Sequence, residues 1–307
     1  MKIKRFLILL VLLILVFSTI NFPTTRASTQ NRVEWEKTFG GDDKESAYQI
    51  IQTDDGGYLV IGDTESYGAG KEDFWILKLS AKGSIEWNKT YGGEGYEEPD
   101  YAIQTTDGGY AVGGHTTSYS DGSKDGWIIK IDSNGELQWD KHYGGAGNEV
   151  FHFIDQTENG DYIVLGYTSS FGDQDKMWYL KLDKNGEIHQ NKTFGGDLGG
   201  FNDATKTKDG RFVLTGWYEK EGDDTYNAFL VKINSSGEVE WTKTYSDSSD
   251  YVATSVIQTS DKGYAISGRV KKSENNEDNF MLIKTDDSGK KEWTRSLGGS
   301  DILTFLK

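Results

Sequence analysis

A segment of about 52 residues recurs along nearly the whole chain, and this repetition constrains the fold more than any other feature. Its first marker is the motif W-x-K-T-F/Y-G-G, whose opening positions are Trp35, Trp87, Trp139, Gln190, Trp241 and Trp293. A second marker is an aromatic residue after a Gly-rich turn, which keeps the same register at Tyr58, Tyr110, Tyr162, Phe212 and Tyr264. Because no linker or change of composition separates the repeats, we expect them to form one domain.

Each repeat contains four short runs, A to D, that are rich in aromatic and β-branched residues. In the second repeat these runs are residues 101–105, 110–114, 127–131 and 137–143. Asp/Asn-Gly turns join A to B and C to D, and such turns favour tight hairpins because Gly accepts a positive φ. Four antiparallel strands in a repeat of this length predict an all-β fold, a β-propeller of about five four-stranded blades.

The number of runs does not match a closed ring. Five A–B–C units are accompanied by six D runs, counting residues 33–41 and 293–299. One interpretation is a five-bladed ring that uses one terminal D run and leaves the other spare. The other is a sixth, incomplete blade, whose unpaired edge would promote self-association.

The N-terminal residues have the pattern of an export signal. Lys2, Lys4 and Arg5 precede an almost unbroken apolar run over residues 6–20, and small residues at Thr25 and Ala27 suit a cleavage site. We therefore expect a signal peptide over residues 1–27, a propeller domain over residues 28–307, and a secreted or cell-surface protein. The alternative is an uncleaved membrane anchor. No later run is long and apolar enough to predict a transmembrane segment.

Charge and cysteine content exclude several classes of function. The formal net charge is −16, which argues against nucleic-acid binding because that function needs clustered Lys and Arg. The absence of cysteine excludes disulfides, thiolate metal sites and a cysteine nucleophile. No phosphate-binding loop, dinucleotide fingerprint or G-x-S-x-G motif is present. No cofactor is required by these patterns.

The repeat motif resembles that of a large group of secreted bacterial and archaeal propeller-repeat proteins. The similarity rests on W-x-K-T-F/Y-G-G, on Q-T-x-D-G-G-Y-x-V/I-x-G and on the C–D run, and it spans residues 33–299. Residues 130–139 also look like the tryptophan-docking repeat of quinoprotein dehydrogenases, which bind pyrroloquinoline quinone and calcium. Those enzymes usually have more blades and often a cysteine pair. We therefore interpret the second similarity as shared blade architecture without a bound quinone.

Antiparallel strands place the B–C and D–A loops together at one end of every blade. These loops are the long, variable ones, and they hold more than half of the 49 acidic residues. Such an acidic loop face predicts a surface for a protein or carbohydrate ligand, or for calcium, which prefers oxygen ligands. The candidate binding residues are Asp121, Asp125, Asp173, Asp175, Asp223 and Asp224, with calcium expected at Asp173 and Asp175. The alternative is a solvated face that keeps the protein soluble.

Residues that recur in every repeat are expected to be structural. The tryptophans predicted to pack between blades are Trp35, Trp87, Trp139, Trp241 and Trp293 of run D, with Trp75, Trp127 and Trp178 of run C. Lysines recur in run C, where they predict ion pairs or snorkelled side chains, as at Lys78 and Lys130. The Gln-Thr pairs that end run A predict hydrogen bonds that stabilise the blades.

These observations favour a secreted, non-enzymatic binding or interaction protein that uses its acidic loop face. No catalytic set is recognisable, and near-identical repeats are more typical of binding or structural proteins than of enzymes. Two alternatives remain open. One is an enzyme, either a polysaccharide-active hydrolase or a quinoprotein-like oxidoreductase. The other is a structural component of the cell surface.

Overall fold

The computed structural model describes residues 34–120, 123–171, 175–195, 199–219, 225–246, 249–271 and 278–298. All of the described strands lie in the unit formed by residues 37–307. The predicted signal peptide and the boundary at residue 28 lie outside the described residues. In the described part of the chain, no helix is long and apolar enough to cross a membrane.

The described residues form five antiparallel sheets of four strands each. The first sheet contains β1 (Glu45–Gln52), β2 (Tyr58–Thr64), β3 (Asp73–Leu79) and β4 (Ile85–Tyr91). The second contains β5 (Glu97–Gln104), β6 (Tyr110–Thr116), β7 (Asp125–Ile131) and β8 (Leu137–Tyr143). The third contains β9 (Glu149–Gln156), β10 (Tyr162–Thr168), β11 (Lys176–Leu182) and β12 (Ile188–Phe194). The fourth contains β13 (Gly200–Lys206), β14 (Phe212–Glu219), β15 (Tyr226–Ile233) and β16 (Val239–Tyr245). The fifth contains β17 (Asp250–Gln258), β18 (Tyr264–Lys271), β19 (Asp278–Thr285) and β20 (Lys291–Leu297).

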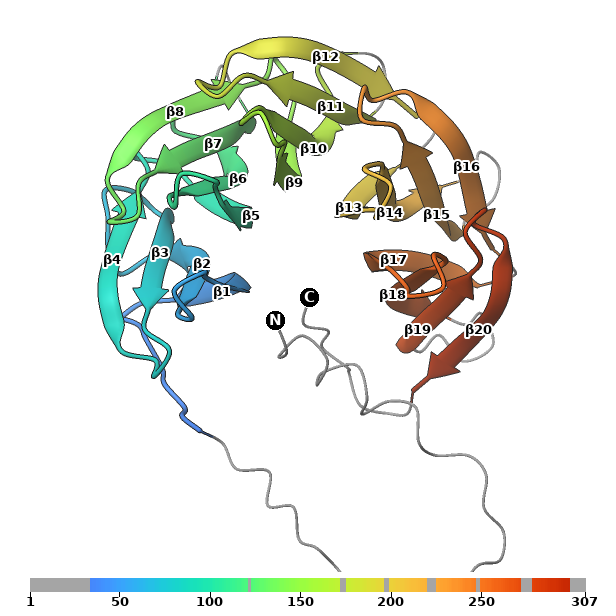
Figure 1. Ribbon diagram of the computed structural model, residues 1–307, viewed down its shortest axis with the longest axis horizontal. Helices are drawn as coiled ribbons and strands as arrows, with labels where there is room; N and C mark the ends of the chain where they lie inside the picture. The colour runs from blue at the N-terminus through green and yellow to red at the C-terminus, as the bar shows by residue number, and fades with distance from the viewer. Residues whose placement is uncertain are drawn as a thin grey trace, which may run out of the picture. The chain divides into compact units, whose positions relative to one another are not determined.

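The five sheets are the blades of a β-propeller, as the repeat predicts. Within unit 37–307 they follow one another around a common centre, with β1, β5, β9, β13 and β17 innermost (Figure 1). Each sheet is built from four consecutive strands, so no blade takes a strand from the other end of the chain. The interpretation of a five-bladed ring that uses one terminal D run and leaves the other spare is confirmed for the described residues, because the run at residues 293–299 belongs to β20 of the fifth sheet and residues 34–44 form no strand.

The A–B turns are built from recurring hydrogen bonds. In the second blade the Gly108 N–H donates to the carbonyl of Thr105 at 2.9 Å, and Gly108 has a φ of 83°. The Thr105 hydroxyl donates to Asp107 at 2.5 Å, and the buried Lys130 forms an ion pair with the same carboxylate at 2.9 Å. Equivalent lysine–turn ion pairs occur in the four other blades, at Lys78, Lys181, Lys232 and Lys284. The ion-pair prediction for the run C lysines is confirmed.

Glutamines at the ends of the inner strands join neighbouring blades. Gln104 Oε1 accepts a hydrogen bond from the backbone N–H of Asp54 in the preceding blade at 2.9 Å. Gln156 and Gln258 accept the same hydrogen bond from Thr106 and Lys208. These glutamines therefore stabilise the junctions between blades, as the sequence predicts.

The recurring tryptophans pack in two different ways. Those of run C are all buried: Trp127 and Trp178 lie in clusters between neighbouring sheets, whereas Trp75 lies in a smaller cluster of the first sheet. Those of run D are only partly buried: Trp87 packs against Gly135 of the next blade and donates a hydrogen bond to the carbonyl of Ser133 at 3.0 Å.

The third and fifth blades depart from this pattern in run D. Gln190 replaces the run D tryptophan in the third blade, and Tyr179 from run C donates to the carbonyl of Ser235 in its place, at 2.8 Å. Trp293 in the fifth blade is 39% exposed, so it is not packed between two described blades. It belongs to the last sheet, where no following described blade covers it.

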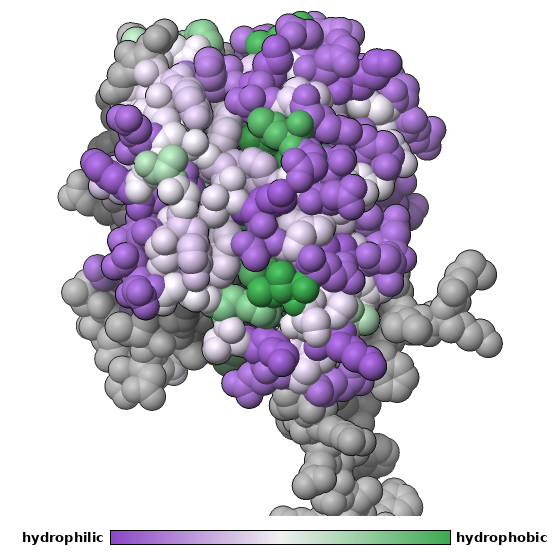
Figure 2. Space-filling model, turned by 90° about the vertical axis from the view of Figure 1, so that its left-hand side faces the viewer, coloured by the Kyte–Doolittle hydropathy of each residue, from purple (hydrophilic) through white to green (hydrophobic). Residues whose placement is uncertain are grey.

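The outer side of the blades is mostly hydrophilic. Figure 2 shows hydrophilic residues over most of this side, interrupted by small, separate hydrophobic patches. The exposed apolar side chains of the outermost strands include Ile85, Leu137, Ile188 and Val239, one near the start of each of four strands. Because they are spaced one to a blade, they do not form a continuous apolar surface.

Candidate functional site

The inner strand of every blade is interrupted by a β-bulge. The pairing register shifts once between A and B in each sheet, which leaves one residue of the A strand without a partner. Opposite each shift, the B strand has a glycine: Gly62, Gly114, Gly166, Gly216 and Gly268. A Cβ at Gly114 would collide with the carbonyl oxygen of Glu98, so only glycine permits this close approach.

The bulged residues occupy one equivalent position, yet all five differ. They are Tyr48, Asp100, His152, Asn202 and Thr254. The neighbouring position on the B strand is equally varied, with Asp63, His115, Tyr167, Trp217 and Arg269. Polar side chains that differ at otherwise repeated positions are typical of a site, because a purely structural role would be met by the same residue in each blade. Bulges are common next to active sites.

In the first blade, the two positions are joined by a short hydrogen bond. The Tyr48 hydroxyl donates to Asp63 Oδ2 at 2.6 Å. Asp63 is buried, whereas Tyr48 is 37% exposed, so the carboxylate fixes a phenol that solvent can reach. Burial raises the pKa of Tyr48, and the hydrogen bond to Asp63 raises it further. The phenol therefore stays protonated and remains a donor at physiological pH.

The second and third blades bring two acid–histidine pairs to the same end of the inner strands. His152 Nδ1 lies 3.4 Å from Asp100 Oδ2, across the junction between the two blades. His115 Nε2 lies 3.7 Å from Glu98 Oε1, and these two residues are cross-strand partners. The side chains of Glu98 and Asp100 are 35% and 21% exposed, so a ligand could reach both carboxyl groups.

The environments of these groups shift their pKa values. Burial raises the pKa of Glu98, and the charges of Asp63 and Asp100 raise it further, against an opposing effect of Lys124. Burial lowers the pKa of His115 to about 4, and Lys124 acts in the same direction. His115 is therefore neutral at pH 7. Both of its ring nitrogens are buried and make no hydrogen bond within the described residues.

Other acids at this end have a structural role. The buried Glu97 accepts hydrogen bonds from the Thr116 hydroxyl at 2.8 Å and from the Gly93 N–H at 2.8 Å, which ties a D–A loop to a B–C loop. Glu149 makes the equivalent bonds to Thr168 and Gly145. Part of the acidity of the loop face therefore serves to shape the loops.

The structure describes two of the six acidic residues that the sequence nominates for ligand binding, Asp125 and Asp175. Asp121, Asp173, Asp223 and Asp224 lie outside the described residues. Asp125 is buried at the start of β7 with its carboxylate against Gly144, whereas Asp175 is exposed just before β11. Within the described ranges, no group of three or more His, Asp or Glu residues could hold a metal ion. Calcium binding stays a prediction.

Sequence reasoning did not single out the bulge positions. The available signal was the glycine that ends the motif Y-x-V/I-x-G in each repeat, because a glycine inside a strand indicates that another backbone segment approaches closely. The residue that precedes the Gln-Thr pair by four positions in run A would then have marked Tyr48, Asp100 and His152 as the places where the repeats differ.

Comparisons with known proteins agree on the fold. No family model matches the sequence, and no curated protein matches it. An α-L-arabinanase from Penicillium chrysogenum has a TM-score of 0.53 at 11% identity, covering 78% of this chain and 88% of its own. The periplasmic gluconolactonase PpgL from Pseudomonas aeruginosa has a TM-score of 0.53 at 10% identity, covering 83% and 73%. A neuraminidase-like protein from A/bat/Guatemala/164/2009 has a TM-score of 0.52 at 11% identity, covering 85% and 79%.

These comparisons correct the functional expectation drawn from the sequence. The non-enzymatic binding protein is the less supported interpretation, because the similar structures include an arabinanase and a gluconolactonase. The identities are so low that the likeness by itself shows only the fold.

Proposed function

We propose that this protein is a polysaccharide-active hydrolase whose site lies on β1, β2, β5, β6 and β9, at the end that carries the B–C and D–A loops. The observation that carries the proposal is the pair Glu98 and Asp100 on one inner strand. Both carboxyl groups are partly exposed, and they lie in different environments. Glycoside hydrolysis needs two carboxyl groups whose protonation states differ.

Glu98 is the general acid in this proposal. Burial raises its pKa, which keeps a proton available for the oxygen of the leaving sugar. The neighbouring His115 is neutral, so it does not stabilise the ionised form of Glu98 as a positively charged imidazolium would.

Asp100 supplies the ionised carboxylate, either to activate water or to stabilise positive charge on the sugar. His152 lies 3.4 Å from it and is a positioning residue for that carboxylate. Tyr48, whose hydroxyl donates to Asp63, offers a sugar an exposed aromatic ring and a hydroxyl oxygen that can accept a hydrogen bond.

The charge of the chain narrows the substrate class. A net charge of −16, with acids concentrated in the loops near this site, repels polyanions such as pectate or sulfated glycans. The proposed substrate is therefore a neutral polysaccharide. Export through the N-terminal segment, and membership of the secreted propeller-repeat group, belong to the same proposal, because a polysaccharide substrate is met outside the cell.

The test measures release of reducing ends from neutral polysaccharides, with arabinan, galactan and xylan in the panel, by the full chain. Glu98→Gln should lose about 10²–10⁴-fold in rate, as expected for loss of a general acid. It should lose much less on an aryl glycoside whose leaving group needs no proton, whereas Asp100→Asn should lose activity on both substrates.

The matched control is Glu94→Gln, an exposed acid in the adjacent D–A loop. It should retain the activity of the unmodified protein on every substrate. The proposal fails if the folded protein releases no reducing ends from the panel. It also fails if Glu98→Gln and Glu94→Gln behave alike.

A further inference from the structure

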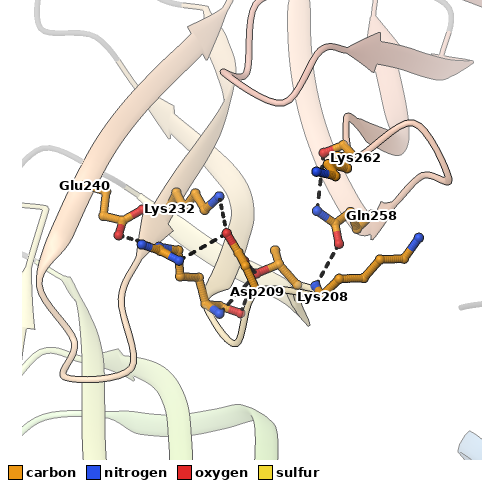
Figure 3. Close-up of polar contacts among 8 residues, drawn as sticks. Lys208, Asp209, Lys232, Glu240, Gln258 and Lys262 are labelled. Atoms are coloured by element: carbon orange, nitrogen blue, oxygen red, sulfur yellow. Dashed lines mark hydrogen bonds and ion pairs between the residues drawn. The ribbon is translucent and has the colours of Figure 1, made fainter.

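A cavity of 430 Å³ lies between the fourth and fifth sheets. Its lining comes from the A–B turns and the facing strands, and includes Lys208, Lys232, Gln258, Lys262 and Tyr264. Figure 3 shows Lys208, Lys232, Gln258 and Lys262 at and beside the two turns. The A–B turns lie at the opposite end of the blades from Glu98 and Asp100, so this cavity is separate from the proposed active site.

Two lysines distinguish these turns from those of the other blades. Lys208 occupies a position that is Asp54, Thr106, Glu158 or Ser260 elsewhere. Lys262 occupies a position that is Gly56, Gly108, Gly160 or Gly210 elsewhere. No other blade has a basic residue at either position. In a chain with a net charge of −16, both changes place positive charge at one cavity.

Lys262 is held in a backbone conformation that disfavours a side chain. Its φ is 73°, and it is the one non-glycine residue with positive φ among the residues described. Its N–H donates to the carbonyl of Thr259 at 3.1 Å, as the equivalent glycines do in the other blades. Strained residues of this kind are concentrated at functional sites, because elsewhere glycine would serve without strain.

The Gln258 side chain forms hydrogen bonds with the backbone of both lysines. Its Oε1 accepts a hydrogen bond from the backbone N–H of Lys208 at 2.9 Å, and its Nε2 donates to the carbonyl of Lys262 at 3.3 Å (Figure 3). These bonds leave the side-chain ammonium groups unused. Neither ammonium group makes an ion pair with another residue that the structure describes.

The acid beside the lysines is already neutralised. Asp209 lies 3.5 Å from the Lys232 ammonium and 3.2 Å from the Arg211 guanidinium, which also bonds Glu240 at 2.5 Å. Asp287 is the second carboxylate of the lining. With Asp209 paired, Lys208 and Lys262 leave the cavity with a surplus of positive charge.

The Tyr264 hydroxyl adds an unused donor to the same cavity. Tyr264 is fully buried, and its oxygen makes no hydrogen bond within the described ranges. Burial raises the pKa of Tyr264 against an opposing effect of the Lys232 ammonium, so the hydroxyl keeps its proton. A buried donor without a partner costs stability unless a ligand or water satisfies it.

We propose that this cavity binds an oxyanion, with Lys208 and Lys262 supplying charge and the Tyr264 hydroxyl supplying a hydrogen bond. The shared chemistry is a compact group with several acceptor oxygens, which sulfate, phosphate and the carboxylate of an acidic sugar all present. The site is independent of the proposed hydrolase activity, which takes a neutral substrate at the other end of the blades.

The test measures binding of inorganic sulfate, inorganic phosphate and an oligogalacturonate to the full chain by calorimetry at low salt, with thermal unfolding in parallel. Lys262→Gly restores the residue of the other blades. It should weaken binding at least about 10-fold while raising the melting temperature of the unliganded protein by about 2 °C through relief of strain. Lys208→Thr should also weaken binding but should leave the melting temperature unchanged.

The control is Lys184→Ser, which removes an exposed lysine from a C–D turn of the third blade. It should bind like the unmodified protein, as should Glu98→Gln. Binding of the inorganic ions alone identifies a site for a free oxyanion, and tighter binding of the oligogalacturonate identifies an acidic glycan as the source. The proposal is overturned if none of the three probes binds, or if Lys262→Gly and Lys208→Thr bind as tightly as Lys184→Ser.

Discussion

The imidazole Nε2 of His115 lies 3.7 Å from Oε1 of Glu98, the residue directly opposite it on the neighbouring strand. Burial raises the pKa of Glu98 and lowers that of His115 to about 4. Both shifts favour the uncharged forms. Glu98 therefore keeps its proton to a higher pH than an exposed glutamate does, beside an imidazole that is neutral at pH 7, and each group is expected to affect a different pH-dependent property.

Activity should decrease as pH rises through the raised pKa of Glu98. A general acid works only while it is protonated, so the loss of its proton removes the acid from the reaction. The logarithm of kcat on a neutral polysaccharide should fall with a slope of about −1 per pH unit above that pKa. Glu98→Gln should abolish this limb of the profile. An unchanged limb in Glu98→Gln would assign it to another group.

Folding stability should decrease as pH falls from about 6.5 to about 4, because of His115. Its pKa is about 4 in the folded state, against a usual value of 6.5, so the unfolded chain binds more protons in this range. The full contribution is on the order of 3 kcal/mol. Urea unfolding of His115→Gln should show a flatter pH dependence, whereas the exposed His189→Gln should match the unmodified protein. Equal profiles for all three would contradict the assignment.

Gly114→Ala should disturb both stability and activity. A Cβ at this position meets the carbonyl oxygen of Glu98, so the bulge must open and the general acid must move. We expect a loss of about 3 kcal/mol and a fall in kcat. The matched change is Gly108→Ala. Gly108 has a positive φ, but a Cβ added there would meet no neighbouring atom. It should cost about 1 kcal/mol and leave kcat unchanged.

Trp87→Ala should be more destabilising than Trp293→Ala. Trp87 contacts the Gly135 turn of the next blade and donates a hydrogen bond to Ser133, whereas Trp293 is 39% exposed and has no described blade beyond it. Because Trp87 is only partly buried, we expect a loss of about 2–3 kcal/mol, against less than about 1 kcal/mol for Trp293. Chemical unfolding curves compare the two. Similar losses would show that the inter-blade contact contributes little.

The architecture was predictable because its determinants are local and repeated. Asp-Gly turns, alternating strands and the run C lysines each appear about five times, so a strand or turn that is ambiguous in one repeat can be assigned from the other repeats. Lys130 and Gln104 could even be given structural roles from recurrence alone, and both roles hold.

The candidate site was not predictable by the same means, because it consists of what the repeats do not share. Asp100 and His152 occupy one equivalent position in adjacent blades, and only their juxtaposition across a junction shows that they form a pair. The raised pKa of Glu98 depends on burial and on charges from another sheet, which sequence spacing does not encode. Charge density in the loops pointed instead to residues such as Asp125, which proves to be buried.

Each sheet is assembled from four consecutive strands, and three of the four junctions between the described sheets reuse the same glutamine hydrogen bond between neighbours. Gain or loss of one whole repeat by gene duplication or deletion would therefore leave every hydrogen-bonded sheet intact. A newly copied repeat would bring its own B-strand glycine and its own bulge. The side chain at the bulge position would have no established partner in a neighbouring blade. Variation at that position could then change the chemistry of the centre while the scaffold stayed the same.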